Sequence, residues 1–286
     1  GVSSAASDVY KRQNLDDAES VVVTSGTATV SEASDIQDIV GYSGADSDYD
    51  ISDSAAALIS AGDHILDVDG VDIVSVNDGA VNANDGAILA SFTADVEFDV
   101  EDSFTNLASV MGTDSAASYL TEADTITVDD GQGGQVVNAN DGAILASFTA
   151  DVEFDVVDDA NAVAAEVTGF NGAGDLDESN TVVVSGGDVD TSEASAIQSI
   201  SGYDGSASDY EITGTAQEVI GAGNSVIEND GVSSVEVTGD ADASEGVSLN
   251  AYDADVEFDV SDTAAAIAEN SGNLGKAAEV FVVSGG

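Results

Sequence analysis

The sequence predicts an α/β solenoid in which a parallel sheet forms one face and short helices form the other. Similar segments recur along the chain, and β-branched runs alternate with helix-like segments. A strand–helix pair of about 26 residues is too short to bury a core alone, so neighbouring pairs must stack. The alternative is a string of all-β sandwich domains, but its strands would have to include the Ala- and Glu-rich segments SEAS and DSAAALI.

Two families of repeats set the period. The string VNANDGAILASFTADVEFDV occurs at Val81–Val100 and Val137–Val156, and its tail returns at Ala254–Val260. A longer family starts at Val21 and recurs 161 residues later at Val182, which corresponds to three repeats of about 54 residues. We predict about five tandem repeats of about 53 residues, placed at 20–71, 72–123, 124–179, 180–232 and 233–277, with the start of a sixth at 278–286.

The first thirteen residues are set apart from the repeats. Their string VSSAASDVYKRQ resembles translated sequencing-adapter read-through, which is common in metagenomic gene predictions. We therefore interpret 1–13 as an artefactual leader and 14–286 as the repeat region of a metagenomic fragment. Lys11 and Arg12 in this leader are two of the three basic residues of the chain.

The first half of each repeat opens with a β-branched run, such as Val21–Val23, and continues into a short helix. Apolar residues from Val30 to Ile39 are spaced for one helical face. We expect Ser31 to cap this helix and Glu32 to complement its positive end. Equivalent polar–acidic pairs are expected to begin helices at Asn84-Asp85, Asn140-Asp141, Ser192-Glu193 and Ser244-Glu245.

The second half of each repeat alternates apolar and acidic residues. Val96, Phe98 and Val100 share one side of a predicted strand, and Glu97 and Asp99 share the other. A polar residue then caps an Ala-rich helix, which ends at a glycine. The expected caps are Ser54, Ser103, Asp159, Thr215 and Thr263, and the expected terminal glycines are Gly62 and Gly223.

The charge limits the partners. The chain has 57 acidic and 3 basic residues, with a formal net charge of -54. This balance excludes nucleic acid, because phosphate binding needs clustered Lys and Arg, and it disfavours anionic membrane surfaces. It favours cations, above all Ca²⁺, and it fits a halophilic or marine source. No apolar run reaches the length of a membrane span, so we expect no membrane insertion.

A short motif connects the chain to known repeats. FDVSDTAAAIAEN, followed by VFVVSGG, resembles the tandem V-x-D-T-A-A-x-I repeats of large secreted bacterial hemolysin-type calcium-binding and adhesin-like proteins. This resemblance implies an extracellular or cell-surface protein. The G-G-x-G-x-D nonapeptide of calcium-binding coils is missing, because the nearest segment, 131–134, lacks the aspartate.

Aspartate-rich turns are the candidate metal site. Asp67, Asp69 and Asp72 have the alternating oxygen spacing of calcium loops, and Asp78 and Asp85 extend the cluster. The glutamate that closes an EF-hand loop is missing. Solvated turns are the competing interpretation, because Asp, Asn and Gly are common turn residues.

Catalytic patterns are missing from the sequence. His64 is the single histidine and no cysteine is present, so a zinc site is excluded and a surface loop is the expected place for this residue. No G-x-S-x-G motif accompanies His64. Recurring aromatic residues predict core packing, with a binding ladder as the alternative; they are Tyr42, Phe98, Phe154, Tyr203 and Phe258.

We therefore expect a structural or adhesive repeat segment of a large, acidic bacterial surface protein that is not an enzyme. The alternative is a calcium- or glycan-binding repeat module. The expected partners are cations and cell-surface or matrix glycans and proteins. Calcium is the one cofactor that the composition favours.

Overall fold

The computed structural model describes residues 18–111, 120–129, 131, 134–147, 151–168 and 176–284. The leader predicted at 1–13 lies outside the described residues. The chain divides into two compact units, Gly1–Gly133 with Phe148–Asp151, and Gly134–Ser147 with Val152–Gly286. Within the described residues, no helix has the length and apolar character needed to cross a bilayer.

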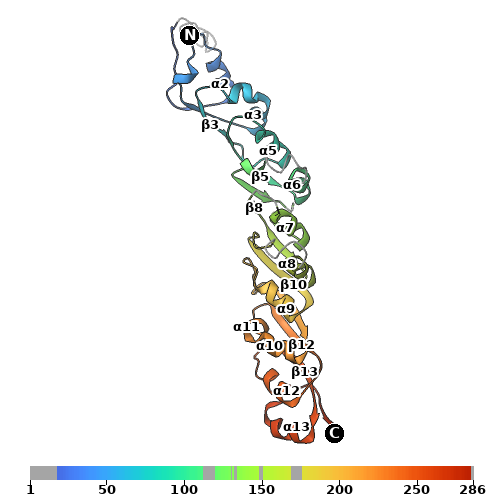
Figure 1. Cartoon of the computed structure of the whole chain (residues 1–286). Helices are drawn as coiled ribbons and strands as arrows, with labels where there is room; N and C mark the ends of the chain where they lie inside the picture. Colours follow the sequence, from blue (N-terminus) through green and yellow to red (C-terminus); the bar gives the residue numbers. More distant parts are fainter. Residues whose placement is uncertain are drawn as a thin grey trace, which may run out of the picture. The chain divides into compact units, whose positions relative to one another are not determined.

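The first unit contains short parallel strands that alternate with short helices (Figure 1). Its four-stranded sheet has the order β1-β2-β3-β4, and β5 pairs with β6. The elements in chain order are β1 (Thr27–Ala28), α2 (Val30–Gln37), η1 (Gly44–Asp46), β2 (Tyr49–Asp53), α3 (Ala55–Ala61), α4 (Asp63–Leu66), β3 (Val71–Val76), α5 (Ala83–Leu89), β4 (Val96–Glu97), β5 (Asp99–Asp102), α6 (Phe104–Met111), η2 (Leu120–Glu122) and β6 (Thr125–Val128).

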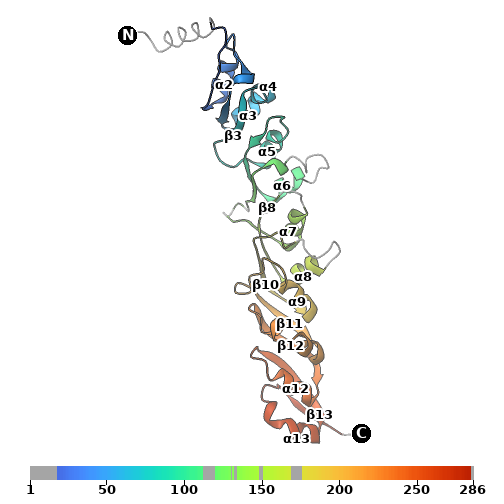
Figure 2. The ribbon, with the colours of Figure 1, turned by 60° about the vertical axis from the view of Figure 1, so that its left-hand side comes forward.

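The second unit contains a seven-stranded sheet with the order β14-β13-β12-β11-β10-β9-β7. Figure 2 shows the colours of this unit running in chain order from α7 to α13. The strand β9 pairs directly with β7, so β8 is not part of this sheet. Its elements are β7 (Val136–Val137), α7 (Ala139–Ala146), β8 (Val152–Glu153), β9 (Asp155–Asp158), α8 (Ala160–Thr168), β10 (Thr181–Asp190), α9 (Thr191–Gln198), β11 (Asp209–Gly214), α10 (Ala216–Ala222), α11 (Asn224–Ile227), β12 (Val232–Ala241), α12 (Ala243–Leu249), β13 (Val256–Thr263), α13 (Ala264–Asn270), η3 (Ser271–Asn273) and β14 (Val280–Val283).

We call one strand with the helix that follows it a βα layer. Within the second unit, α8 packs on α7 and α9, α10 on α9 and α12, and α12 on α13. Within the first unit, α3 packs on α2 and α5, and α5 packs on α6. Each layer therefore buries its apolar side against the layers before and after it. The α/β class with parallel strands is confirmed in place of the all-β alternative, whereas a solenoid through the whole chain stays a prediction.

The predicted alternation of the second half-repeat is confirmed in β4 and β5. Val96, Phe98 and Val100 are buried, whereas Glu97 and Asp99 are exposed. Period-two alternation places successive side chains on opposite faces of a strand, so the apolar row faces the helices and the acidic row faces solvent. The recurring aromatic residues Phe154 and Phe258 are buried in the same way, which confirms their assignment to the core.

The predicted start of the first-half helices was wrong by two residues. The cap of α2 is Thr29, not Ser31: Thr29 accepts from the backbone N–H of Glu32, and the Glu32 carboxylate accepts from the backbone N–H of Thr29. Ser31 lies inside the helix, where its backbone is helical and cannot serve as a cap. The caps of the equivalent helices are Asn82, Asn138, Asp190 and Asp242.

The predicted N-terminal caps and terminal glycines of the Ala-rich helices are confirmed. Ser54, Thr215 and Thr263 each accept a hydrogen bond from a backbone N–H in the first helical turn. Gly62 and Gly223 follow the last residues of α3 and α10 with φ of 63° and 72°, a conformation that glycine adopts without steric cost. Ser103 and Asp159 accept in the same way before α6 and α8.

Candidate functional site

The five predicted metal ligands are spread over several elements of the first unit. Asp67 lies at the end of α4, Asp69 lies in the turn that follows, and Asp72 lies on β3; all three are exposed. The backbone carbonyl of Asp69, rather than its carboxylate, accepts a hydrogen bond from the Tyr42 hydroxyl (3.1 Å). The carboxylates of Asp67, Asp69 and Asp72 do not gather into a group that could hold a metal ion.

The carboxylates of the other two predicted ligands accept hydrogen bonds from groups at the starts of helices. The Asp78 carboxylate accepts from the backbone N–H of Ala55 (3.0 Å), the first residue of α3. The Asp85 carboxylate accepts from the side-chain amide of Asn82 (2.8 Å), which caps α5. Over the parts of the chain that the structure describes, no three His, Cys, Asp or Glu side chains gather where they could hold one metal ion. Calcium binding at these residues thus stays a prediction.

A different set of carboxylates has a recurring position at strand ends. Asp53 closes β2 and accepts from the backbone N–H of Val30 (3.0 Å), the first residue of the helix in the preceding layer. It also accepts from the backbone N–H of Ser54 (2.8 Å). Three other strand-end aspartates accept the same two hydrogen bonds from backbone N–H groups. Asp102 accepts from Ala83 and Ser103, Asp158 from Ala139 and Asp159, and Asp262 from Ala243 and Thr263.

These carboxylates link consecutive layers. The first N–H groups of a helix have no partner within the helix, and the positive end of the helix favours an anion. Backbone hydrogen bonds from Thr263 and Ala243 lower the pKa of Asp262 below its usual range. This role was not predicted from the sequence, although an aspartate at the end of a strand that precedes a capped helix recurs there.

Buried tyrosines that are each bonded to a half-buried glutamine form a second recurring site. The Gln37 side-chain amide donates to the Tyr49 hydroxyl (3.0 Å) and to the backbone carbonyl of Ile65 (2.9 Å). Gln198 donates in the same way to Tyr210 (2.8 Å) and to the carbonyl of Val226 (3.1 Å). Each glutamine therefore ties its helix to the next strand and to the short helix, α4 or α11, that precedes the strand after that.

These tyrosines are held in the neutral form. Burial raises the pKa of Tyr49 to about 12, and burial also raises the pKa of Tyr210. Tyr42 and Tyr203 are only half-buried, so the prediction of core packing holds less fully for them than for the phenylalanines. Their hydroxyls donate to the backbone carbonyls of Asp69 and Asp230. Each of these two hydroxyls therefore holds its ring against the turn that precedes β3 or β12.

The two remaining ionisable residues of interest are also exposed. His64 is exposed as predicted, but it lies on the short helix α4 rather than in a loop, because Gly62 starts a new helical turn there. The ammonium group of Lys276 donates to the backbone carbonyls of Tyr252 and Ala254. Among the residues that the structure describes, His64 belongs to no group of three His, Cys, Asp or Glu side chains that could hold a metal ion.

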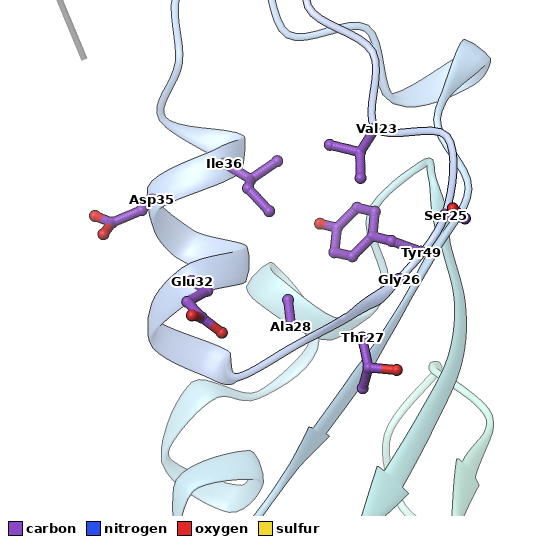
Figure 3. A pocket seen from close by; sticks show the side chains of 9 residues that line it. All are labelled: Val23, Ser25, Gly26, Thr27, Ala28, Glu32, Asp35, Ile36 and Tyr49. Atoms are coloured by element: carbon purple, nitrogen blue, oxygen red, sulfur yellow. The ribbon is translucent and has the colours of Figure 1, made fainter. Parts of the chain in front are cut away.

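An open pocket of about 640 Å³ lies beside the first βα layer, which consists of β1 and α2 (Figure 3). The ring of Tyr49 and the side chains of Val23 and Ile36 point into it, whereas Asp35 points away. A second pocket of about 440 Å³ is lined mainly by residues 89–96. The first pocket pairs an apolar floor with a rim that carries Glu32, and its lining contains neither a histidine nor a lysine.

Comparison of the chain with protein-family models, with curated proteins and with solved structures finds no match. The resemblance to secreted bacterial repeats therefore stays an expectation.

Proposed function

We propose that this chain is a structural spacer, a repeat segment of a large, acidic, extracellular bacterial protein whose role is to set distance between other parts rather than to catalyse a reaction. The observation that carries this proposal is the order of the seven-stranded sheet, in which parallel strands follow one another in chain order. In such a sheet each added layer extends the sheet by one strand spacing, about 4.8 Å. Length is then encoded by the number of repeats.

The distribution of polar groups supports a passive role. Carboxylates at strand ends and glutamates at helix starts are bonded to backbone N–H groups, and the buried tyrosines are bonded to glutamines. These hydrogen bonds stabilise the layers, and over the described part of the chain no three His, Cys, Asp or Glu side chains gather where they could hold a metal ion. No buried side-chain nitrogen or oxygen atom in the described residues is without a hydrogen-bond partner.

The charge supports an exposed setting. A net charge of -54 repels other copies of the chain and other polyanions at low ionic strength. Strongly screened, salt-rich surroundings reduce this repulsion, since the Debye length falls to about 3 Å at 1 M salt. We therefore place the protein at the surface of a cell that lives in a saline environment.

The experiment is a length series. Three extra copies of residues 180–232, inserted after residue 232, would add about six strands and extend the molecule by roughly 30 Å. Small-angle scattering measures the maximum dimension of the parent and of the series. Growth by equal increments supports the spacer, whereas a constant dimension or an unfolded insertion contradicts it.

Calcium binding is tested on the same protein. CaCl₂ and NaCl solutions of matched ionic strength are compared by thermal melting and by titration calorimetry. For a spacer we expect equal shifts of the melting temperature and no saturable heat. Saturable heat with a fixed number of ions per repeat would favour the calcium-binding alternative, and Asp69→Asn with Asp72→Asn would then be expected to remove it.

A further inference from the structure

The strands of the second unit are staggered along their common direction. The first part of β10, Thr181–Val184, pairs with β9, and the second part, Ser185–Asp190, pairs with β11 on the other side. The strand β9 therefore ends beside the middle of β10, at the level where β11 begins. The two partners of β10 thus lie one ahead of the other along the strand direction.

The same stagger recurs in the rest of this sheet. The strand β12 pairs with β11 through Val232–Val237 and with β13 through Val235–Ala241. The strand β13 pairs with β12 through Val256–Val260 and with β14 through Val260–Thr263. Each of these strands is bonded to the preceding strand by its first part and to the next strand by its later part.

Side-chain hydrogen bonds oppose sliding of one strand along the next. The Ser208 hydroxyl, just before β11, accepts from the backbone N–H of Val184 in β10 (3.0 Å). The Ser233 hydroxyl of β12 donates to the backbone carbonyl of Tyr210 in β11 (2.9 Å). Both bonds would have to break before the strands could shift relative to each other.

A staggered parallel sheet transmits a pull along its strands. A strand that is held by one neighbour near its start and by the other near its end carries tension between them. The ladder hydrogen bonds of a parallel pair are evenly spaced along the strands. A force parallel to the strands therefore loads all bonds of one ladder together, whereas a force across the strands opens the same ladder one bond at a time.

We propose that the second unit bears tension, with the staggered strands from β10 to β13 as the load path. A pull that enters at the start of β10 and leaves at the end of β13 loads each ladder between them in shear. This role goes beyond setting distance, and it rests on the proposed spacer function, because a spacer is pulled when the parts that it separates move. The unit then resists unfolding more strongly along its strands than across them.

The test compares two directions of pull on the full chain. The chain has no cysteine, so a pair of introduced cysteines gives two defined attachment points for DNA handles in optical tweezers. Asp209→Cys with Asp240→Cys places the handles at the start of β11 and near the end of β12, so the pull runs along the strands.

The matched control is Asp209→Cys with Asp230→Cys. Both handles then lie at the starts of the same two strands, so the pull runs across them. Each pair replaces two exposed aspartates, so the change in charge is the same. Urea unfolding without load checks that the two pairs are equally stable.

Forced unfolding is governed by the unfolding rate. We expect the along-strand pair to unfold at least about tenfold more slowly than the control pair at the same force. If one of these variants does not fold, the comparison is repeated on β12 and β13. Asp230→Cys with Ala264→Cys then pulls along the strands, and Asp230→Cys with Asp255→Cys pulls across them.

Equal unfolding rates in the two directions, or a faster rate along the strands, overturn the tension-bearing role. The spacer function fails separately, because the length series by small-angle scattering involves no force. Growth of the series by equal increments together with equal unfolding rates would leave the spacer in place and remove the tension-bearing role alone.

Discussion

Residues 21–79 and 182–240 are two versions of one segment, and they reach the same arrangement by different capping. Both contain a strand, a helix that starts with a capping box, and a buried tyrosine bonded to a glutamine. In the first version Asp53 and Asp78 reach back to the helix of the preceding layer. In the second version these two positions are Gly214 and Gly239, which have no side chain to do so.

In the second version, the free backbone N–H groups at the start of α10 are bonded by residues of the same layer. Thr215 and Glu218 form a capping box at the start of α10, whereas the equivalent helix α3 has Ser54 and Ala57 at these positions. The link through a strand-end carboxylate is therefore one of two solutions to the same problem of unpaired backbone N–H groups. Features that both versions keep, the tyrosine–glutamine pair and the close glycine contacts, are the ones that the fold requires.

The largest expected effect is the removal of the buried ring. Tyr210→Ala should lower the free energy of unfolding by about 3–5 kcal/mol, because it leaves a cavity and unpairs Gln198. Tyr49→Ala should cost less, because its ring lines the open pocket and the cavity can fill with water. Urea unfolding of both variants measures the difference. Equal losses would contradict the distinction between a covered and an uncovered layer.

Two glycines should behave alike in the two versions. A Cβ atom at Gly44 would lie 2.2 Å from the backbone oxygen of Asp69, and one at Gly205 would lie 2.2 Å from that of Asp230. Gly44→Ala and Gly205→Ala are each expected to cost about 1–3 kcal/mol, because a backbone segment must move. Thermal melting checks both. Gly221→Ala, at a position with no atom within 4 Å of an added Cβ, is the control.

The strand-end carboxylate should matter in the first version alone. Asp53→Ala removes two hydrogen bonds to backbone N–H groups and is expected to cost about 1 kcal/mol. Asp72→Ala, which removes an exposed carboxylate from the next strand, is the control and should be near neutral or slightly stabilising. A loss as large for Asp72→Ala as for Asp53→Ala, measured by chemical unfolding, would argue against the link between layers.

The smallest effect is a dependence on pH. Hydrogen bonds from Thr215, first from its backbone and then from its side chain, lower the pKa of Glu218 below 4.5, and Thr29 does the same for Glu32. A lowered pKa means that the contribution to stability is full above about 4.5 and is lost as the pH falls through the lowered value. Glu218→Ala should therefore destabilise the protein at pH 7, and the difference from the parent should vanish on acidification.

A difference that is the same at pH 7 and at acidic pH would show that the Glu218 carboxylate does not carry this contribution. Melting curves of the parent and the variant in matched salt make the comparison.

Much of this arrangement was predictable from the sequence. The alternation around Phe98 and the polar residues before Ala-rich segments gave the strands and the helix caps of the second half-repeat. The caps of the first half-repeat were misplaced because the prediction used the adjacent polar–acidic pair Ser31-Glu32. The true cap, Thr29, lies three residues before Glu32, which is the spacing of a capping box. Glycines inside α5, α7 and α12 let each helix approach a strand valine, which local patterns do not reveal.

The candidate sites were harder to predict. Because aspartate is abundant throughout this sequence, the alternating aspartates around Asp69 are compatible both with a calcium-binding loop and with a solvated turn. The contact of Asp102 with Ala83 joins residues in different layers, and it depends on the pairing of strands, which is set by tertiary structure rather than by local sequence.

Neighbouring layers complete each other's core, and the two versions of one helix allow this packing to be measured. The helices α2 and α9 share the segment SEAS and the capping box, but α9 packs against α8 and α10, whereas α2 packs against α3 on one side and faces the open pocket on the other. Native-state hydrogen exchange, at low salt and low concentration, measures the opening free energy of each. We predict that α9 amides exchange at least about tenfold more slowly than α2 amides. Equal exchange in the two helices would contradict it.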